Sequence, residues 1–289
     1  MKLVDFLTLL FVSILWGGSF LFLRLLVLEG LAPLEIVSIR MMLAALFITP
    51  FFIVKFKKYS FYDHGFAFVL VGILNTALPF TLFAFASVEL GAGSLSILQA
   101  TVPILTALLL FSIYKGEFSV FKLIGVVIGF VGLFVLVGPS GGFDPFSSIL
   151  CIIASLSYAI AGIYLAKTPE RISNSFIGMG SIIVGAIIML PFLLTSSNTL
   201  QNLTRDSWTY LAILGVINTS LAYVIFIKLI KKIGPINASF VTYLVPVSSI
   251  SLGILVLDEA FTIPMFAGSM LIFMGVFFAN SEKKPKKLL

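Results

Sequence analysis

The stretch "GILNTALPFTLF" (72–83) decides the fold, because it occurs a second time as "GVINTSLAYVIF" (215–226). The two copies lie 143 residues apart (215 − 72), and the same offset aligns further residues towards the C-terminus. The aligned identities include Gly72/Gly215, Asn75/Asn218, Thr76/Thr219, Leu78/Leu221, Phe83/Phe226, Gly91/Gly234, Ser96/Ser239, Pro103/Pro246, Gly125/Gly268, Gly132/Gly275 and Phe134/Phe277. Chance matching of apolar segments does not supply so many glycine, proline and asparagine pairs. The sequence therefore predicts an internal duplication, with one copy at 1–140 and a second at 141–289.

The repeat lies within a very apolar chain. Of the 289 residues, 60% are hydrophobic and only 10% are charged, whereas soluble domains carry about 25% charged residues. So many apolar side chains cannot all be buried in one aqueous core, because about a quarter of the chain's surface stays exposed at this size. The composition excludes a soluble globular protein and an intrinsically disordered chain. We therefore predict an integral membrane protein.

Charges and turn residues divide the chain into ten apolar stretches, each close to the ~20 residues that a membrane-spanning helix needs. The stretches are 4–27, 33–54, 65–87, 93–113, 119–137, 146–166, 174–194, 208–229, 236–257 and 264–280. Their continuous apolarity favours helices over the alternating strands of a β-barrel. The first stretch is longer than the apolar part of a signal peptide, so we expect it to remain as a span. The predicted fold is an all-α membrane protein with ten transmembrane helices.

The basic residues predict the orientation of these helices. Of the 18 Lys and Arg residues, all except Arg24, Arg40 and Arg205 lie on one side of the membrane if the connections alternate. That side carries Lys2, Lys55, Lys57, Lys58, Lys115, Lys122, Lys167, Arg171, Lys228, Lys231, Lys232, Lys283, Lys284, Lys286 and Lys287. Because positive loops stay in the cytoplasm, we expect a plasma (inner) membrane protein with both termini cytoplasmic. The distribution explains the net charge of +6 without a nucleic-acid partner.

Each copy of the repeat contains five spans, so the second copy must enter the membrane upside down. The flanking charges agree with this inversion. The third span follows Lys57 and Lys58, whereas the eighth span follows Asp206 and precedes Lys231 and Lys232. Inverted repeats are typical of carriers, in which two copies form a central site that opens alternately to either side of the membrane. The sequence therefore predicts two inverted five-helix repeats around a central cavity.

Four segments resemble the drug/metabolite transporter superfamily, in its EamA-like branch. They are "LWGGSFLFLRL" in the first span, "IRMMLAAL" in the second, "ILQATVPILTALLL" in the fourth and "VTYLVPVSSISLGILVLDE" in the ninth. The resemblance covers nearly the whole chain. It implies ten helices in two inverted halves and the transport of small metabolites. Characterised members export amino acids, and others take up S-adenosylmethionine or move nucleotide sugars.

The resemblance also assigns family positions to individual residues. The Trp-Gly pair of the first span is Trp16-Gly17, and the arginine of the second span is Arg40. The paired prolines are Pro103 and Pro246, and the glutamates that end the fourth and ninth spans are Glu117 and Glu259. The second half departs from this pattern. It has Tyr158 in place of the tryptophan and no counterpart of Arg40, which implies an asymmetric site.

Arg40 lies about seven residues into its span, which places it about 10 Å from the helix end. An arginine inside the membrane costs about 2.5–3.5 kcal/mol on insertion scales and usually marks a functional site. One interpretation is that Arg40 attracts a substrate carboxylate or phosphate. The other is that it pairs with Glu35 or Glu29 near the same end. The sequence leaves both open.

Other polar and aromatic residues within the spans complete the candidate binding site: Trp16, Gln99, Tyr158, Tyr243, Asn75 and Asn218. Amide groups suit a polar or zwitterionic substrate, because they both donate and accept hydrogen bonds. For the repeated Asn75 and Asn218, helix packing or a hinge is the favoured interpretation. Packing is also an alternative for each aromatic ring. Pro79, Pro103 and Pro246 are expected to interrupt helices for gating.

The sequence offers little for catalysis or energy coupling. One Cys and one His leave no metal site and no disulfide framework, and we predict no cofactor and no catalytic residue. The absence of a Walker motif excludes an autonomous ATP-driven pump, and no acidic residue lies at mid-span for proton coupling. We expect a secondary transporter for amino acids or amino-acid-like compounds, as a monomer or weak homodimer. S-adenosylmethionine or a nucleotide-type metabolite is the alternative substrate; an intramembrane enzyme and a channel are the alternative classes.

Overall fold

The computed structural model describes residues 2–56, 61–113, 120–137, 144–169, 173–195, 203–248 and 263–280, and no strand occurs in these ranges. The helices of residues 1–140, the predicted first copy, are α1 (Leu3–Gly17), α2 (Ser19–Leu28), α3 (Pro33–Phe56), α4 (Phe61–Gly72), η1 (Ile73–Ala77), α5 (Leu78–Ala86), α6 (Ala92–Gln99), α7 (Val102–Ile113) and α8 (Val120–Val137). Those of the second are α9 (Pro145–Lys167), α10 (Asn174–Thr195), α12 (Arg205–Ala212), η2 (Ile213–Leu221), α13 (Ala222–Ile233), α14 (Pro235–Ser239) and α16 (Ile263–Asn280). Residues 241–248 are also helical.

Helices occur at each of the ten positions expected from the apolar stretches, although 249–257 of the ninth stretch lies outside the described residues. Within the described ranges, six segments are long and apolar enough to cross a membrane: Leu3–Leu28, Pro33–Phe56, Asp63–Ala86, Pro145–Lys167, Asn174–Leu194 and Arg205–Ile233. Shorter apolar segments lie at Leu123–Gly132 and Phe266–Gly275. The chain is therefore a helical, multi-pass membrane protein.

The third and eighth stretches each contain a wide π-helical segment in place of a regular α-helix. The offset of 143 residues carries η1 (Ile73–Ala77) onto positions 216–220, which lie inside η2 (Ile213–Leu221). Local hydroxyls support both segments: Thr76 Oγ1 donates to the Gly72 carbonyl, and Thr219 Oγ1 donates to the Leu214 carbonyl at 2.7 Å. Because π-helical turns often accompany functional sites, these segments point to the region where the repeated motif lies.

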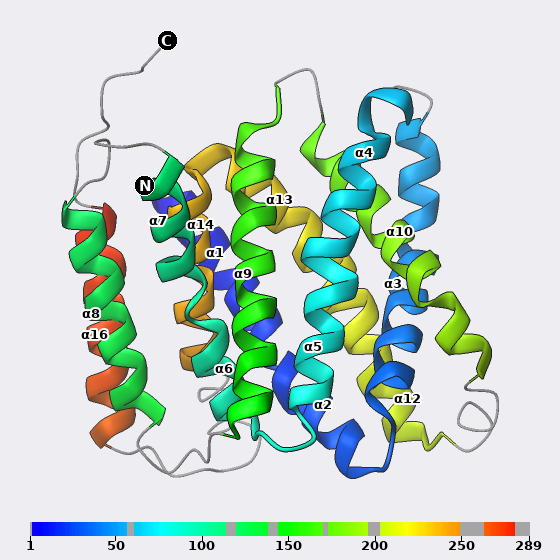
Figure 1. The fold of residues 1–289 in the computed structure, drawn as a ribbon, viewed down its shortest axis with the longest axis horizontal. Helices are drawn as coiled ribbons and strands as arrows, with labels where there is room; N and C mark the ends of the chain where they lie inside the picture. Colours follow the sequence, from blue (N-terminus) through cyan, green and yellow to red (C-terminus); the bar gives the residue numbers. More distant parts are fainter. Residues whose placement is uncertain are drawn as a thin grey trace.

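The last helices of the two copies, α8 and α16, pack against each other at one edge of the molecule (Figure 1). A Cβ atom on Gly132 would lie 2.9 Å from the Gly268 carbonyl, and one on Gly275 would lie 2.6 Å from the Gly125 carbonyl. A late position of each helix thus meets an early position of the other, so the helices run antiparallel. Gly125 aligns with Gly268, and Gly132 aligns with Gly275. The contact of Gly132 with Gly268 is therefore the equivalent of the contact of Gly275 with Gly125.

A second reciprocal contact joins the π-helical segments to the long helices α3 and α10. A Cβ atom on Gly72, directly before η1, would lie 3.0 Å from the Ser181 carbonyl of α10. A Cβ atom on Gly215, inside η2, would lie 2.7 Å from the Arg40 carbonyl of α3. Each copy therefore packs its repeated motif against the second span of the other copy. The close approach requires glycine, since any side chain would separate the helices.

The fourth and ninth stretches are both interrupted. In the fourth, α6 ends at Gln99 and α7 begins at Val102, directly before Pro103. In the ninth, α14 ends at Ser239 and the helix resumes at 241, after Phe240. Pro246 does not lie at this interruption as expected; it lies inside the helical residues 241–248. Because proline has no N–H, Pro246 cannot donate a hydrogen bond to the carbonyl four residues earlier. That carbonyl belongs to Thr242, beside the interruption.

Pro79 is the other proline for which we expected an interruption. It occupies the first turn of α5, directly after η1. The backbone stays helical from η1 into α5, so Pro79 lacks an N–H that would otherwise bond to the preceding turn. This hydrogen bond is missing beside the change from π-helix to α-helix, which lies between Ala77 and Leu78.

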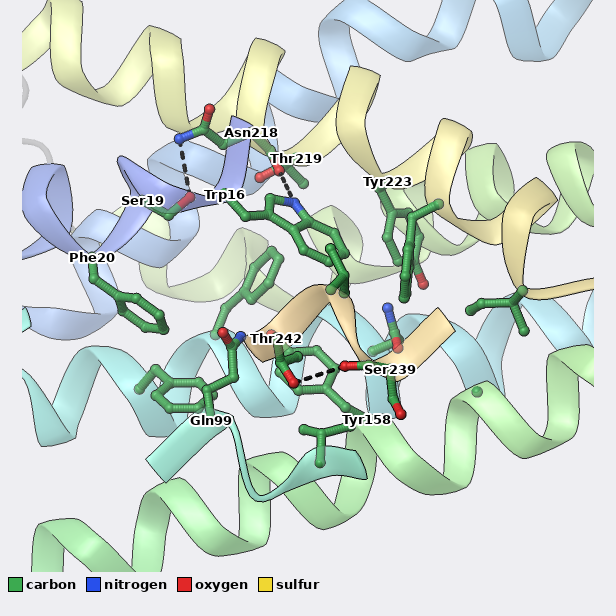
Figure 2. A pocket seen from close by; sticks show the side chains of 18 of the residues that line it. Trp16, Ser19, Phe20, Gln99, Tyr158, Asn218, Thr219, Tyr223, Ser239 and Thr242 are labelled. Atoms are coloured by element: carbon green, nitrogen blue, oxygen red, sulfur yellow. Dashed lines mark hydrogen bonds between the residues drawn. The ribbon is translucent and has the colours of Figure 1, made fainter. Parts of the chain in front are cut away.

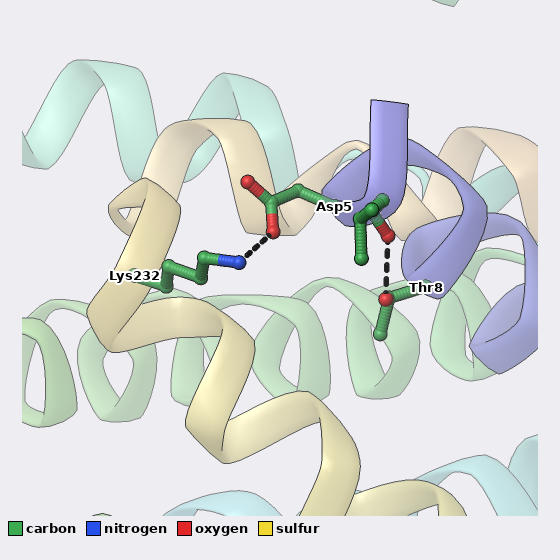
Figure 3. A network of polar contacts seen from close by, with 4 residues as sticks. Asp5, Thr8 and Lys232 are labelled. Atoms are coloured by element: carbon green, nitrogen blue, oxygen red, sulfur yellow. Dashed lines mark hydrogen bonds and ion pairs between the residues drawn. The ribbon is translucent and has the colours of Figure 1, made fainter. Parts of the chain in front are cut away.

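Polar contacts join the helix ends on both sides of the pocket. At one side an ion pair joins Asp5 of α1 to Lys232 of α13 (Figure 3), and Lys231 Nζ donates to the Thr168 carbonyl at 2.7 Å. At the other side Arg24 Nη1 donates to the carbonyls of Ser87 and Val88 at 2.6 and 2.9 Å. The contacts of Arg24 are consistent with a long side chain that reaches the membrane surface from the end of α2.

The start of the second copy is fixed by a helix cap. The Asp144 carboxylate accepts the Ser147 backbone N–H at 2.8 Å, in front of Pro145, the first residue of α9. This hydrogen bond stabilises the ionised carboxylate and lowers the pKa of Asp144. An acidic cap followed by proline is a common start of a helix, so α9 begins where the sequence places its sixth span.

Candidate substrate pocket

A pocket lies between helices of residues 1–140 and helices of residues 141–289, and its empty space amounts to about 950 Å³ when the open solvent at its mouth is included. Residues of α1, α2, α3, η1, α5, α6, α7 and α9 line it together with residues of η2, α13, α14 and 241–242 (Figure 2). The pocket lies beside both π-helical segments and both helix interruptions. Gln99 and Val102 flank the first interruption, and Ser239 and Val241 flank the second. Broken helices free backbone groups where the chain lines a cavity.

Arg40 projects from α3 into this pocket and is only 7% exposed. Its Nε–H donates to Thr219 Oγ1 at 2.8 Å, and its Cζ atom lies 3.9 Å from the centre of the Phe80 ring. Arg40 therefore contacts Thr219 and Phe80 rather than Glu35 or Glu29, the pairing that the sequence left open. The Glu35 carboxylate accepts the Ala32 N–H at 2.9 Å, and Glu29 accepts a hydrogen bond from Ser207.

Trp16 and Asn218 connect the first span to the repeated motif of the second copy (Figure 2). The indole Nε1 of Trp16 donates to the Asn218 carbonyl at 2.8 Å, and Asn218 Nδ2 donates to Ser19 Oγ at 3.0 Å. The Trp16 ring also meets Phe226 edge to face, with ring centres 4.8 Å apart. All four residues line the pocket. The hydrogen bonds of Asn218 match the packing interpretation of the asparagine pair.

Gln99, Tyr158 and Asn75 also line the pocket. The Oε1 atom of Gln99 is buried and has no hydrogen-bond partner among the described residues. The Tyr158 ring stacks on Phe83 with ring centres 6.3 Å apart. Asn75 lies near Tyr223, whose buried hydroxyl faces Asn75 and Ser181 without a hydrogen bond of normal geometry. Gln99 Oε1 and the Tyr223 hydroxyl are therefore buried polar atoms without a hydrogen-bond partner among the described residues.

Tyr243 lies outside the pocket lining, unlike the other predicted binding residues. It is fully buried, its ring lies against Gly129, and its hydroxyl donates to the Val126 carbonyl of α8 at 2.8 Å. Gly129 leaves space for the ring, and the Val126 carbonyl accepts the hydrogen bond of the hydroxyl. Tyr243 therefore joins residues 241–248 to α8, and its mid-span position gave no indication of which side of the helix it occupies.

Sequence reasoning left out several polar residues that line the pocket: Ser19, Thr106, Thr219, Ser239 and Thr242. The duplication offered a signal for some of them. Ser239 aligns with an identical serine, Thr219 aligns with Thr76, and Thr242 is the counterpart of Gln99. Short hydroxyl side chains within apolar spans were not selected because they bond readily to their own helix. Ser239 Oγ does so, donating to the Ile236 carbonyl at 2.8 Å.

The polar groups that line the pocket suit the binding of a small molecule. No cluster of three or more His, Cys, Asp or Glu side chains that could hold a metal occurs among the described residues. The described lining combines one guanidinium, amides, hydroxyls and aromatic rings. This arrangement can hold a small molecule with a negatively charged group and an apolar or aromatic body.

A multi-pass helical chain whose two halves surround one pocket defines a class of membrane proteins. Comparison with known families identifies the class. The EamA-like transporter family matches this chain twice, at residues 5–138 and 145–281. The chain therefore belongs to the EamA-like transporter family, as its sequence motifs indicated.

Relatives of similar length carry transporter names. The chain is 24% identical to the "Uncharacterized transporter YoaV" of Bacillus subtilis, covering 94% of this chain and 96% of the relative. It is 23% identical to the "Uncharacterized inner membrane transporter YedA" of Escherichia coli K12, covering 83% and 78%. A solved crystal structure shares the fold with a TM-score of 0.72 at 14% identity, covering 97% of this chain and 98% of that chain. The family and these names indicate transporters rather than enzymes.

Proposed function

We propose that the protein is a secondary transporter that carries small polar metabolites across the inner membrane by alternating access. The observation that carries this proposal is the pocket: residues from both copies surround one buried cation, Arg40, within otherwise apolar helices. A substrate with a carboxylate or phosphate would bind Arg40 through charge-assisted hydrogen bonds. The relative from Escherichia coli is named an inner membrane transporter, which supports the location.

Alternating access requires two equivalent halves of opposite orientation. The reciprocal contacts support this arrangement, since α8 and α16 occupy equivalent positions in the two copies and run antiparallel. Ten spans, five in each of the copies 1–140 and 141–289, fit both the helix positions and the two family matches. With both termini cytoplasmic, Asp5 and Lys232 lie at the cytoplasmic end of the pocket and Arg24 lies at the outer end.

Amino acids or amino-acid-like compounds are the substrate class that the pocket supports best. Arg40 suits a carboxylate, and Gln99 and the hydroxyl groups suit a polar backbone. The aromatic rings of Trp16 and Tyr158 favour one alternative, a nucleotide-type metabolite or S-adenosylmethionine, whose base would stack on them. The described lining residues include no carboxylate for proton transfer, which favours exchange or facilitated transport over proton coupling.

Flux measurements in vesicles test the proposal. The purified protein is reconstituted, and uptake of labelled candidate compounds is measured with and without unlabelled compound on the opposite side. A carrier gives saturable uptake that the trans compound accelerates. Uptake that never saturates would indicate a channel, and chemical conversion without uptake would indicate an enzyme; either result rejects the proposal.

A further inference from the structure

The pocket contains an uncompensated positive charge. Among the described lining residues, Arg40 is charged and the others are neutral. The guanidinium bonds to the neutral hydroxyl of Thr219 through Nε and lies over the neutral ring of Phe80. Both contacts stabilise a cation without cancelling its charge. Because the surrounding helices have a low dielectric constant, an unpaired charge there is costly.

Nearby acidic side chains within the described residues have contacts elsewhere. Glu35 bonds to the N–H of Ala32 at the start of α3, and Glu29 bonds to Ser207 at the start of α12. Asp5 pairs with Lys232 at the opposite end of the pocket. Among the described residues no carboxylate therefore pairs with Arg40, which leaves its charge for a bound molecule to balance.

We infer that the transported compound is a monoanion: a monocarboxylate whose nitrogen, where it has one, is uncharged. This inference rests on the proposed transport function and, within its class of amino acids and amino-acid-like compounds, selects those with an uncharged nitrogen over free amino acids. Arg40 and a monoanion form a neutral complex when the pocket closes. A zwitterionic amino acid would leave the complex with one net positive charge and would bury an ammonium group without a carboxylate partner.

The remaining lining residues fit the uncharged part of such a compound. The unpartnered Oε1 of Gln99 can accept an N–H from a neutral amide. The rings of Trp16, Phe20 and Phe83 offer apolar faces to a ring or a branched side chain. N-acyl amino acids with aromatic side chains combine one carboxylate, one neutral amide N–H and one ring, and so match all three features.

Four compounds with one ring and different charges test the inference: N-acetylphenylalanine, phenylalanine, N-acetylphenylalanine amide and phenylalanine amide. At neutral pH they are an anion, a zwitterion, a neutral molecule and a cation. We expect N-acetylphenylalanine to raise the melting temperature of the full-length protein and to bind at least about tenfold more tightly than the other three. Equal or tighter binding of phenylalanine, or no stabilisation by the monoanion, overturns the inference.

Two variants test which side chains recognise the carboxylate and the amide N–H of the ligand. Arg40→Gln should remove the preference for N-acetylphenylalanine over its neutral amide. Gln99→Leu should lower the affinity for N-acetylphenylalanine more than it lowers the affinity for 3-phenylpropionate, which lacks the N–H. If the Arg40→Gln variant folds and still binds N-acetylphenylalanine more tightly than its neutral amide, the inference is contradicted.

Vesicle uptake separates this inference from the proposed function. Trans-stimulated uptake of phenylalanine without uptake of the monoanion would leave the transport proposal intact and reject the monoanion. Tight binding of N-acetylphenylalanine without any uptake would keep the charge preference and reject transport.

Discussion

Arg40 gives the clearest expectation at the scale of single residues. Arg40→Ala should lower the initial rate of uptake about 10- to 150-fold, since charged hydrogen bonds contribute about 1.5–3 kcal/mol. Arg40→Lys should restore uptake only in part, because lysine keeps the charge and loses the planar fork. The measurement is uptake in vesicles normalised to folded protein.

Glu35→Ala is the matched control for the Arg40 variants. Glu35 caps the start of α3 through the Ala32 N–H, so its loss should lower stability slightly and leave the uptake rate unchanged. If Glu35→Ala were as inactive as Arg40→Ala and the double variant recovered uptake, Arg40 would be one half of a structural ion pair.

Trp16 offers a second test at this scale. Trp16→Phe keeps a ring beside Phe226 and removes the N–H that binds the Asn218 carbonyl at 2.8 Å. We expect a loss of about 0.5–1.5 kcal/mol in unfolding free energy, the net contribution of one hydrogen bond. Thermal unfolding in detergent measures it. Trp208→Phe, at a position 40% exposed on α12, serves as the control; equal effects of the two changes would argue against the hydrogen bond.

The candidate site could be predicted in part from single residues. Polar side chains in apolar spans are energetically costly, so their presence there marks them as candidates. Arg40, Gln99 and both asparagines were predicted in this way, and all of them line the pocket. Their role in binding stays a prediction. Tyr243 shows the limit of the approach, because a helix that is apolar on all sides gives no sign of which face meets the cavity. Its contact with α8 depends on a glycine more than a hundred residues away in sequence.

At the scale of helices, the glycine contact between α8 and α16 sets the next prediction. Gly132→Ala and Gly275→Ala should each lower the unfolding free energy by about 1–3 kcal/mol, because the added Cβ would overlap the facing backbone. Apparent melting temperatures in detergent provide the measurement. Gly91→Ala is the control, since a Cβ atom there meets no atom within 4 Å. Unchanged stability in all three variants would show that the helices separate easily.

Helix positions could be predicted well, and helix irregularities could not. The apolar stretches ended within a few residues of the described helices because charged residues mark the membrane boundaries. The π-helical segments and the interruption at Phe240 gave no such signal. They depend on hydroxyl contacts with local carbonyls and on packing between copies, such as Gly215 against α3. In the ninth stretch the interruption lies at Phe240, and Pro246 lies inside the helical residues 241–248.

At the scale of the whole molecule, the orientation in the membrane is the main prediction. Cys151 is replaced by Ser to remove the single cysteine, and one new cysteine is introduced as Lys57→Cys, Ser197→Cys or Ser281→Cys, at positions outside the described residues. In intact cells, an impermeant thiol reagent should label only the Ser197→Cys variant. Labelling of the Lys57→Cys variant instead would reverse the orientation and place Asp5 and Lys232 at the outer end of the pocket.

The contact between α8 and α16 also has a consequence for biosynthesis. Gly125 leaves the ribosome 150 residues before Gly275, the residue of α16 that it faces (275 − 125), an interval of roughly 8–30 s at about 5–20 residues per second. During this interval the glycine face of α8 has only lipid or the insertion machinery as a neighbour. The first copy therefore cannot complete its packing while it is being made. Nascent chains stalled before residue 263 should be far more sensitive to membrane proteases than chains that contain α16.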